Sequence, residues 1–385
     1  MNFLRIIPSH FLWLLVASAA FSAPLRAAEP AALAGVLRPF VDDRMIAGAV
    51  VLIADSEKVL GVDTVGWSDL AAKKPMRPDA MFWVASMTKP ITCTALMMLV
   101  DEGKVDVEAP VEKYLPEFKG QLFIAQRDSD QQVLKKPTRP VLVRDLMSHT
   151  SGITQRSLPG VLKGEQATLA TRVAAYATQP LEWEPGSKYL YQNAGIDTVG
   201  RIVEKVSGRS YAQFLQERLF EPLGMKDTTF WPTKEQAARI ATAYKPTSDK
   251  TGLEPTQRAL LERGQEPHPS GGLYSTATDM ATFCQMILNG GTFNGRRYVS
   301  PERIALMTRR QTGAKLSESY GFGWTTRDGL ISHNGAWKTN MTITPEARLI
   351  TILLVQNSGW RNDAEGRKIE PTFRQAAVER FAAKR

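Results

Sequence analysis

The chain has 385 residues, of which 43% are hydrophobic and 23% are charged. This composition is that of a soluble globular protein with enough apolar residues for a large core, arranged as one domain or two sub-domains. The 48 basic and 39 acidic residues give a net charge of +9, and no run of five like charges occurs. We therefore expect no nucleic-acid partner, and only a weak attraction of the mildly basic surface to an anionic cell envelope.

The first residues follow the order of a secretory signal peptide. A short basic start at residues 1–5 precedes an apolar run at residues 11–20, and the small residues Ala20 and Ser22 form a cleavage site. We predict a signal peptide at residues 1–22 and a periplasmic or secreted protein. The alternative is an uncleaved membrane anchor, although the apolar run is shorter than the ~20 residues that span a bilayer.

The next segment predicts a helix and then a β-hairpin. Residues 31–45 form the helix, and two apolar runs at residues 47–54 and 59–67 form the strands. A polar turn at residues 55–58 separates the two runs, which is typical of a hairpin.

Ser86-Met87-Thr88-Lys89 is the most informative motif of the chain. It directly precedes the apolar run 91–100, which predicts a buried helix that ends near Gly103. Residues i and i+3 share one helical face, so the Lys89 amine can reach the Ser86 hydroxyl. Burial lowers the pKa of a lysine, and a helix start offers free N–H groups to an oxyanion. The motif therefore predicts a serine nucleophile with a lysine base.

The middle of the chain is mainly helical. A mixed stretch at residues 122–134 predicts a second hairpin, and helical patterns dominate from residue 168 to residue 220. Within them, Tyr191-Gln192-Asn193 precedes a predicted helix at residues 194–206. The phenol of Tyr191 can relay protons, and the amide of Asn193 can bind a substrate amide.

His149 lies in the sequence Ser-His-Thr-Ser-Gly, which suggests a Ser-His-Asp triad. However, the chain contains no Gly-x-Ser-x-Gly elbow, the turn that carries the serine in many such enzymes. We therefore expect His149 to organise its loop.

Strands return toward the C-terminus, interrupted by helices. The segment Ser332-His333-Asn334-Gly335-Ala336-Trp337 follows a strand-like pair and leads into another strand. Its small residues let a substrate lie against the strand edge and bond to the backbone. The patterns predict helices at residues 277–288, 302–309 and 372–383, and strands at residues 321–326, 340–344 and 349–356.

Strands at both ends with helices between them predict an α/β (α+β) fold. We expect one antiparallel sheet, assembled from distant segments and flanked by helices, with an inserted, mostly helical sub-domain. The domain would span residues 30–382, with an α/β part at about 30–92 and 270–382 and a helical part at about 93–269. The site would lie between the two parts.

Neither a metal nor a cofactor is expected. Cys93 and Cys284 are the two cysteines, and both lie in apolar helical patterns, so each is predicted to be a buried thiol. No cysteine or histidine spacing matches a zinc site.

The serine-lysine, tyrosine-asparagine and histidine-asparagine-glycine elements, in this order, resemble those of a known family. This family is the penicillin-recognising serine hydrolases with the class C β-lactamase fold. It includes D-alanyl-D-alanine carboxypeptidases, D-aminopeptidases and esterases. The resemblance extends from about residue 30 to about residue 380. Secondary stretches at residues 143–153, 219–225, 270–279 and 320–324 also look like the family.

The resemblance implies a role for each motif residue. Ser86 would be the acylated nucleophile, Lys89 its base and Tyr191 a proton shuttle. The backbone N–H groups of Ser86 and Ala336 would form the oxyanion hole. Asn193 would contact the acyl-side amide or hold Lys89.

The third element departs from the Lys-Thr-Gly of β-lactamases, because His333, Asn334 and Gly335 replace it. In those enzymes the lysine and the hydroxyl help to hold the substrate carboxylate. Histidine also occurs here in some D,D-peptidases and many esterases of the family. The substrate class therefore stays open between an amide, as in a β-lactam or a D-amino-acid peptide, and a carboxylic ester.

We further expect His333 to line the site and to change the preference for anionic substrates as it titrates between about pH 5.5 and 8. A small-molecule or peptide substrate is expected, and the oligomeric state stays open. The alternative to an exported serine acyl hydrolase is a catalytically silent envelope protein that binds peptidoglycan fragments.

Overall fold

The structure is a computed structural model that describes residues 1, 33–155, 168–256 and 265–382. The described residues from Leu33 onward belong to one compact unit. The predicted signal peptide at residues 1–22 lies outside the described residues, apart from Met1. Among the helices that the structure describes, none is long and apolar enough to cross a membrane.

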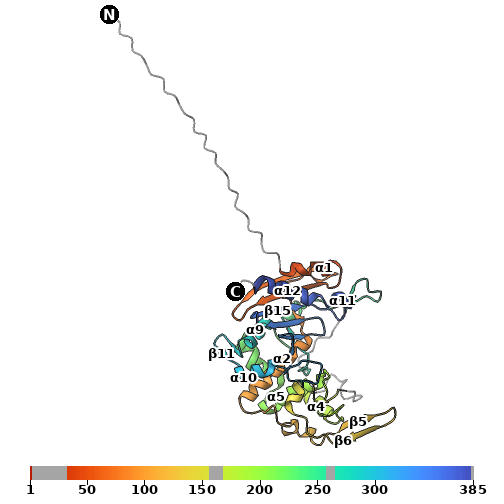
Figure 1. The fold of residues 1–385 in the computed structure, drawn as a ribbon. Helices are drawn as coiled ribbons and strands as arrows, with labels where there is room; N and C mark the ends of the chain where they lie inside the picture. Colours follow the sequence, from red (N-terminus) through yellow and green to blue (C-terminus); the bar gives the residue numbers. More distant parts are fainter. Residues whose placement is uncertain (2–32, 156–167, 257–264, 383–385) are drawn as a thin grey trace. The chain divides into compact units, whose positions relative to one another are not determined.

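A seven-stranded antiparallel sheet confirms the predicted fold class (Figure 1). Its strand order is β12-β13-β14-β15-β1-β2-β3, so the predicted N-terminal hairpin pairs with strands from the C-terminal part of the chain. The sheet is therefore assembled from distant segments, as predicted. Its strands are β1 (Gly48–Ala54), β2 (Val59–Asp69), β3 (Lys74–Pro75), β12 (Thr325–Arg327), β13 (Leu330–Asn334), β14 (Asn340–Thr344) and β15 (Leu349–Leu354).

The central strand β1 is buried on both faces. Val50 and Leu52 belong to the larger hydrophobic core, and Val51 and Ile53 belong to a second core on the opposite face. Helix α9 (Ala277–Leu288) contacts β1, β14 and β15, whereas α12 (Ile369–Phe381) packs against β15 and the 3-10 turn η1 (Leu33–Leu37). Burial on both faces explains why β1 is a continuous apolar run without alternation.

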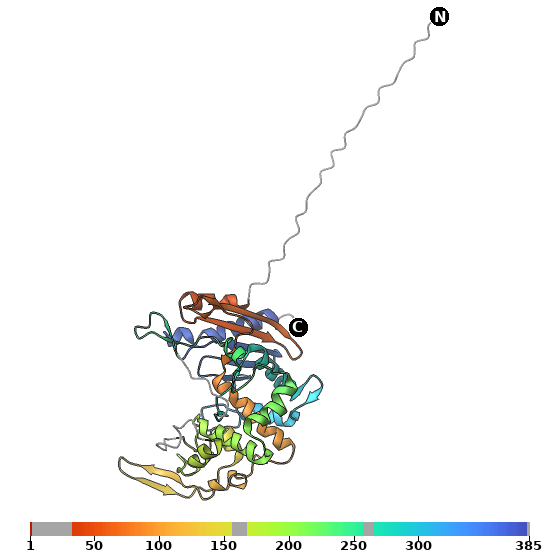
Figure 2. The same ribbon diagram turned by 180° about the vertical axis from the view of Figure 1, so that it is seen from behind.

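A second group of helices forms a part of its own around α2 (Thr88–Asp101). Every residue of α2 from Thr88 to Val100 is buried, and α5 (Asn193–Ser207) contacts it directly. The hairpin of β5 (Phe123–Arg127) and β6 (Gln132–Lys135) lies at the end of this part that is remote from the sheet (Figures 1 and 2). The other elements are α1 (Arg38–Asp42), α3 (Val143–Met147), α4 (Leu169–Ala177), α6 (Tyr211–Leu215), the π-helix Gln216–Phe220, α7 (Glu221–Leu223), α8 (Lys234–Ala237), α10 (Pro301–Thr308), α11 (Asp363–Gly366), β4 (Phe82–Trp83), β5 (Phe123–Arg127), β6 (Gln132–Lys135), β7 (Tyr244–Pro246), β8 (Leu253–Pro255), β9 (Tyr274–Ser275), β10 (Thr292–Phe293) and β11 (Arg296–Arg297).

Two predicted elements differ from the structure. The helix predicted at residues 31–45 is a 3-10 turn followed by the short helix α1, because Pro39 lacks the N–H that a continuous helix needs and fits only in a first turn. The strand predicted at residues 321–326 begins only at Thr325. Gly323 has a φ of +78° and packs against Cys93 of α2, so the backbone is not extended there.

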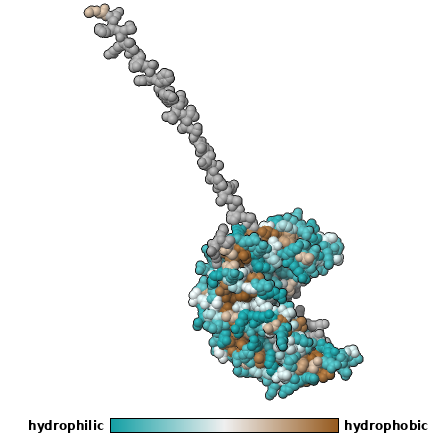
Figure 3. Space-filling model, viewed as in Figure 1, coloured by the Kyte–Doolittle hydropathy of each residue, from teal (hydrophilic) through white to brown (hydrophobic). Residues whose placement is uncertain are grey.

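The surface is mainly hydrophilic on the face that Figure 3 shows, and apolar residues are scattered over it. Large apolar side chains with more than a third of their area exposed include Leu190 and Tyr191, which lie side by side in the chain. Scattered exposed apolar residues are normal, but two adjacent ones next to a predicted motif point to a ligand site.

Replacement of Phe283 tests the packing of α9 against the segment that leads into β12. The Phe283 ring stacks on Trp324 with centroids 6.1 Å apart, and both residues are fully buried. Phe283→Ala should therefore lower the free energy of unfolding by about 3–5 kcal/mol in urea titrations. Thr278→Ala, at an exposed position of the same helix, is the control and should change it by less than about 0.5 kcal/mol. Equal effects of the two substitutions would contradict this packing role.

Candidate active site

Ser86 lies in a 3-10 turn, Ala85–Met87, between strand β4 and helix α2. β4 is held by pairing with β9, and the Thr88 hydroxyl donates to the Ala85 carbonyl at 2.7 Å. Ala85 has a φ of +46°, which turns the chain sharply in front of Ser86. The nucleophile candidate therefore stands at the start of a fully buried helix on a turn fixed from both sides.

Lys89 is fully buried and points at Ser86. Its Nζ lies 3.0 Å from Ser86 Oγ, 2.9 Å from Asn193 Oδ1 and 2.6 Å from the Ser270 carbonyl oxygen. The two carbonyl-type oxygens can only accept hydrogen bonds. In the neutral amine both N–H groups therefore go to Asn193 and Ser270, and the lone pair is left for the Ser86 hydroxyl.

The electrostatics favour the neutral amine near pH 7. Burial lowers the pKa of Lys89 to about 7, and the charge of Asp197 partly offsets this shift. A lysine with this pKa is present as free amine and as ammonium in comparable amounts at neutral pH, so a large fraction can act as a base. Its position and its protonation state are those that a general base for Ser86 requires.

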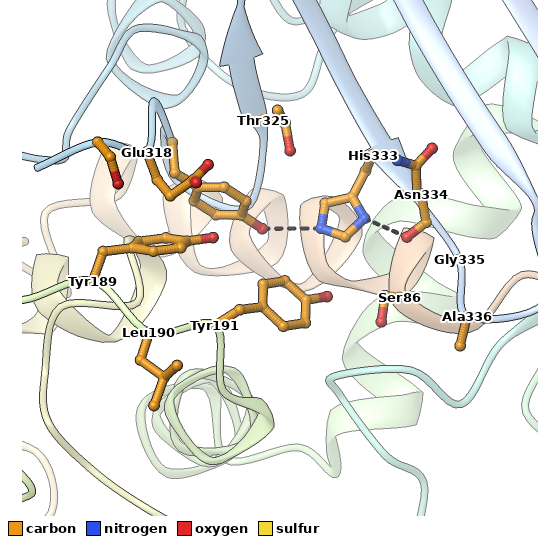
Figure 4. A pocket seen from close by; sticks show the side chains of 12 residues that line it. Ser86, Tyr189, Leu190, Tyr191, Glu318, Thr325, His333, Asn334, Gly335 and Ala336 are labelled. Atoms are coloured by element: carbon orange, nitrogen blue, oxygen red, sulfur yellow. Dashed lines mark hydrogen bonds between the residues drawn. The ribbon is translucent and has the colours of Figure 1, made fainter. Parts of the chain in front are cut away.

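Tyr191 lies next to both Ser86 and Lys89. Burial raises the pKa of Tyr191 to about 12, and the neighbouring Ser86 hydroxyl partly offsets the rise. The Lys89 Nζ lies 4.7 Å from the centroid of the Tyr191 ring. The residue remains 39% exposed at the pocket, and its hydroxyl points toward Ser86 in Figure 4. Tyr191 therefore stays protonated at neutral pH and can pass a proton between Ser86 and the pocket.

His149 organises this region. Its Nδ1 accepts the Gln192 N–H at 3.3 Å, and its ring lies 4.5 Å from the Tyr191 ring between centroids. Burial and the nearby Lys89 lower its pKa well below the usual value, so the imidazole is neutral. Its contacts are with the residues around Tyr191, which agrees with the organising role that we expect for His149.

Asn193 is the first residue of α5 and lies behind the pocket. The 2.9 Å contact from Lys89 Nζ to its Oδ1 means that it holds Lys89, one of the two roles considered for it.

His333 is buried, and both of its ring nitrogens have partners. Nδ1 lies 2.8 Å from the Asn334 carbonyl oxygen, and Nε2 lies 2.9 Å from the Tyr320 hydroxyl. Because a carbonyl can only accept, Nδ1 carries the hydrogen and Nε2 accepts from Tyr320. Burial, together with the charge of Lys89, lowers the pKa of His333 to about 3. The expected titration of His333 between pH 5.5 and 8 is therefore wrong, because burial keeps the ring neutral over that range.

Gly335 brings the loop after β13 against the turn that carries Ser86. A Cβ at Gly335 would lie 2.0 Å from Thr339 Oγ1 and 2.6 Å from the Val84 carbonyl oxygen, so only glycine fits. The Thr339 hydroxyl donates to the same Val84 carbonyl at 3.3 Å. This contact sets Ala336 beside Ser86 (Figure 4).

A pocket of about 690 Å³ gathers most of the predicted site residues (Figure 4). Lys89 and Asn193 are not among its lining residues; they support Ser86 from behind. The lining residues are Ser86, Tyr189, Leu190, Tyr191, Ser317, Glu318, Tyr320, Thr325, His333, Asn334, Gly335 and Ala336.

Sequence reasoning missed three partners of the site. Tyr320 bonds to His333, Ser270 accepts from Lys89, and Asp197 accepts the Ser270 N–H at 3.1 Å. Asp197 follows Asn193 by four residues on one helix face, which is a signal that the sequence contains. Ser270 acts through its backbone, for which the sequence gives no signal.

Cys93 and Cys284 are free and buried, and burial raises the pKa of both thiols. Within the ranges that the structure describes, no three His, Cys, Asp or Glu side chains form a group able to hold a metal ion.

Known proteins resemble this chain in sequence or in fold. A family model described as beta-lactamase matches residues 33–370. Esterase EstB of Burkholderia gladioli is 29% identical over 311 residues, which cover 73% of this chain and 74% of EstB. The D-alanyl-D-alanine-carboxypeptidase/endopeptidase AmpH of Escherichia coli is 26% identical, over 73% of this chain and 72% of AmpH.

Among solved structures, that of EstCE1, a hydrolase with promiscuous acyltransferase activity, matches with a TM-score of 0.74. The two chains are 24% identical, and the match covers 90% of this chain and 97% of EstCE1. This likeness concerns the fold, whereas the family match spans most of the sequence. The chain therefore belongs to the beta-lactamase family of serine hydrolases.

Proposed function

We propose that this protein is an exported serine esterase that acts through an acyl-enzyme on Ser86. The observation that carries the proposal is the 3.0 Å contact between Ser86 Oγ and a buried amine with a pKa of about 7. The amine is held by two acceptors that leave its lone pair to the hydroxyl. The same observation argues against a catalytically silent protein that only binds envelope fragments.

The reaction would follow from these positions. Lys89 takes the proton of the Ser86 hydroxyl as Oγ attacks the ester carbonyl carbon, and a tetrahedral oxyanion forms. The carbon–oxygen bond to the alcohol breaks, and the alcohol leaves with a proton relayed by Tyr191. Water then attacks the acyl carbon while Lys89 takes one of its protons, the ester bond to Ser86 breaks as Ser86 Oγ takes that proton back, and the acid is released.

The oxyanion hole would consist of the N–H groups of Ser86 and Ala336. The packing of Gly335 on Val84 supports this assignment, because it sets the Ala336 backbone against the turn of Ser86. Donors fixed in this way stabilise developing charge without reorganising during the reaction. His333 supports the same strand end, since its Nδ1–H holds the Asn334 carbonyl.

The charge of the pocket supports a neutral ester as substrate. Its described lining contains no lysine or arginine, His333 is neutral, and Glu318 contributes a carboxylate. A substrate carboxylate, as in a β-lactam or a D-amino-acid peptide, would therefore lack a cationic partner here. The exposed Leu190 and the tyrosines beside it offer apolar surface to an acyl chain instead. The similarity to EstB, an esterase, supports an ester substrate. The similarity to AmpH, a carboxypeptidase/endopeptidase, is the reason to include a peptide substrate in the activity test below.

The first segment of the chain supports the proposed export, with its basic start, apolar run and small-residue cleavage site. An exported, mildly basic enzyme would work in the periplasm or outside the cell, near an anionic envelope.

Labelling with a fluorophosphonate tests the nucleophile. The intact wild-type protein should gain the mass of one adduct and hydrolyse p-nitrophenyl butyrate with a higher kcat/KM than nitrocefin or a D-Ala-D-Ala peptide. Ser86→Ala should lose the adduct and all turnover, because no other group in the proposed reaction can form the acyl-enzyme. Ser129→Ala, at an exposed position of the β5–β6 turn, is the matched control and should behave as wild type. An adduct that persists in Ser86→Ala would refute the assignment, and preference for nitrocefin or the peptide would refute the ester.

The pH dependence of kcat/KM should follow the protonation of the Lys89 amine. For a neutral ester, activity should rise with pH through a midpoint near 7, because protonation below that pH removes the lone pair that takes the Ser86 proton. His333 adds no step in this range, since its pKa is about 3. A stopped assay of p-nitrophenyl butyrate hydrolysis from about pH 5 to 9 measures this limb. A profile that is flat across pH 7 would contradict a lysine base.

Gly335→Ala should lower kcat by roughly 10²-fold while KM changes little, because the added Cβ displaces the Ala336 N–H from the oxyanion. Gly35→Ala is the control, since a Cβ there meets no atom within 4 Å. Steady-state kinetics with the ester measure both variants, and circular dichroism checks that they are folded. A folded Gly335→Ala variant with wild-type kcat would exclude Ala336 from the oxyanion hole.

A further inference from the structure

Asp197 is a buried carboxylate that does not line the pocket. It is 3% exposed and lies on α5, one helical turn after Asn193. Its Oδ1 accepts the Ser270 N–H at 3.1 Å, and its Oδ2 accepts from the Tyr176 hydroxyl at 3.2 Å. Burial of a charged carboxylate is costly. Two hydrogen bonds from neutral donors do not by themselves explain why an aspartate occupies this position.

The Ser270 peptide links this carboxylate to Lys89. Its N–H donates to Asp197 and its carbonyl accepts from Lys89 Nζ at 2.6 Å. Asn193, which holds the same amine, lies at i−4 from Asp197 and so on the same face of α5. One helix face therefore holds Lys89 directly through Asn193 and indirectly through Ser270.

We propose that Asp197 is a positioning residue for Lys89, whose charge and Ser270 contact hold the amine against Ser86. The inference rests on the proposed function, because it gives Asp197 a part in the same reaction. The charge of Asp197 favours the ammonium form, whereas burial favours the free amine. Asp197 thus keeps the base from becoming too weak to take the proton of Ser86.

The other titratable groups around Lys89 are uncharged at neutral pH. Cys93 on α2 is a thiol whose pKa burial raises, and Tyr191 has a pKa of about 12. His149 and His333 are neutral because burial lowers the pKa of each. Around Asp197 itself, the phenols of Tyr176 and Tyr211 are also neutral, since burial raises both of their pKa values. Arg172 lies near Tyr176 and lowers the pKa of that phenol.

Asp197→Asn tests the charge with little change of shape. In protein labelled with ¹³C-lysine, the Cε resonance of Lys89, assigned with Lys89→Arg, reports the titration of the amine whether or not the chain hydrolyses esters. The midpoint should fall by about one pH unit or more in Asp197→Asn, since removal of an opposite charge destabilises the ammonium. The acidic limb of fluorophosphonate labelling at Ser86 should move to lower pH by the same amount.

Asp279→Asn is the matched control, because Asp279 is a second buried aspartate on α9 whose partners are the Asp227 N–H and the Thr228 hydroxyl. It should leave the Lys89 midpoint unchanged. Asp197→Ser, which removes the charge and retains an acceptor, replaces Asp197→Asn if that variant does not fold. An unchanged midpoint, or an equal shift in Asp279→Asn, overturns the inference. If the wild-type protein is not labelled at Ser86, the proposed function is overturned instead. The Lys89 midpoint measured by NMR still tests the role of Asp197 in that case.

Discussion

The site depends on the burial of one amine. Lys89 is removed from water in a helix whose other residues are nearly all buried, and its hydrogen bonds go to Ser86, Asn193 and Ser270. Burial destabilises the ammonium, while the fixed acceptors decide where the lone pair of the free amine points. The same arrangement in water would leave the lysine charged and mobile, with no preference for the Ser86 hydroxyl.

The residues of the site come from separate parts of the fold. The 3-10 turn before α2 carries Ser86, α2 carries Lys89, α5 carries Asn193, and the loop after β13 closes the site from the sheet. Close approach is possible because Gly323 packs on α2 and Gly335 packs on Val84, where any side chain would collide. The pocket therefore lies where the sheet and the helical part meet, and rigid elements fix its geometry.

The third motif element has a different task from the lysine that β-lactamases carry there. Buried His333 is neutral, donates to the Asn334 carbonyl and accepts from Tyr320. It orders the strand end and brings no positive charge to the pocket. The rest of the described lining is neutral apart from Glu318 and contains no lysine or arginine, which suits a neutral substrate better than an anionic one.

The sequence by itself determined the elements whose signal is local. The Ser86 and Lys89 spacing, the first hairpin, helix α9 and strand β14 follow from periodicity and apolar runs. Only the tertiary structure decided the partners of Lys89, because Asn193 and Ser270 are 104 and 181 residues away along the chain. The charge state of His333 and the place of Asp197 were decided in the same way. Burial and hydrogen bonding between distant segments set protonation, and a local pattern carries no information about either.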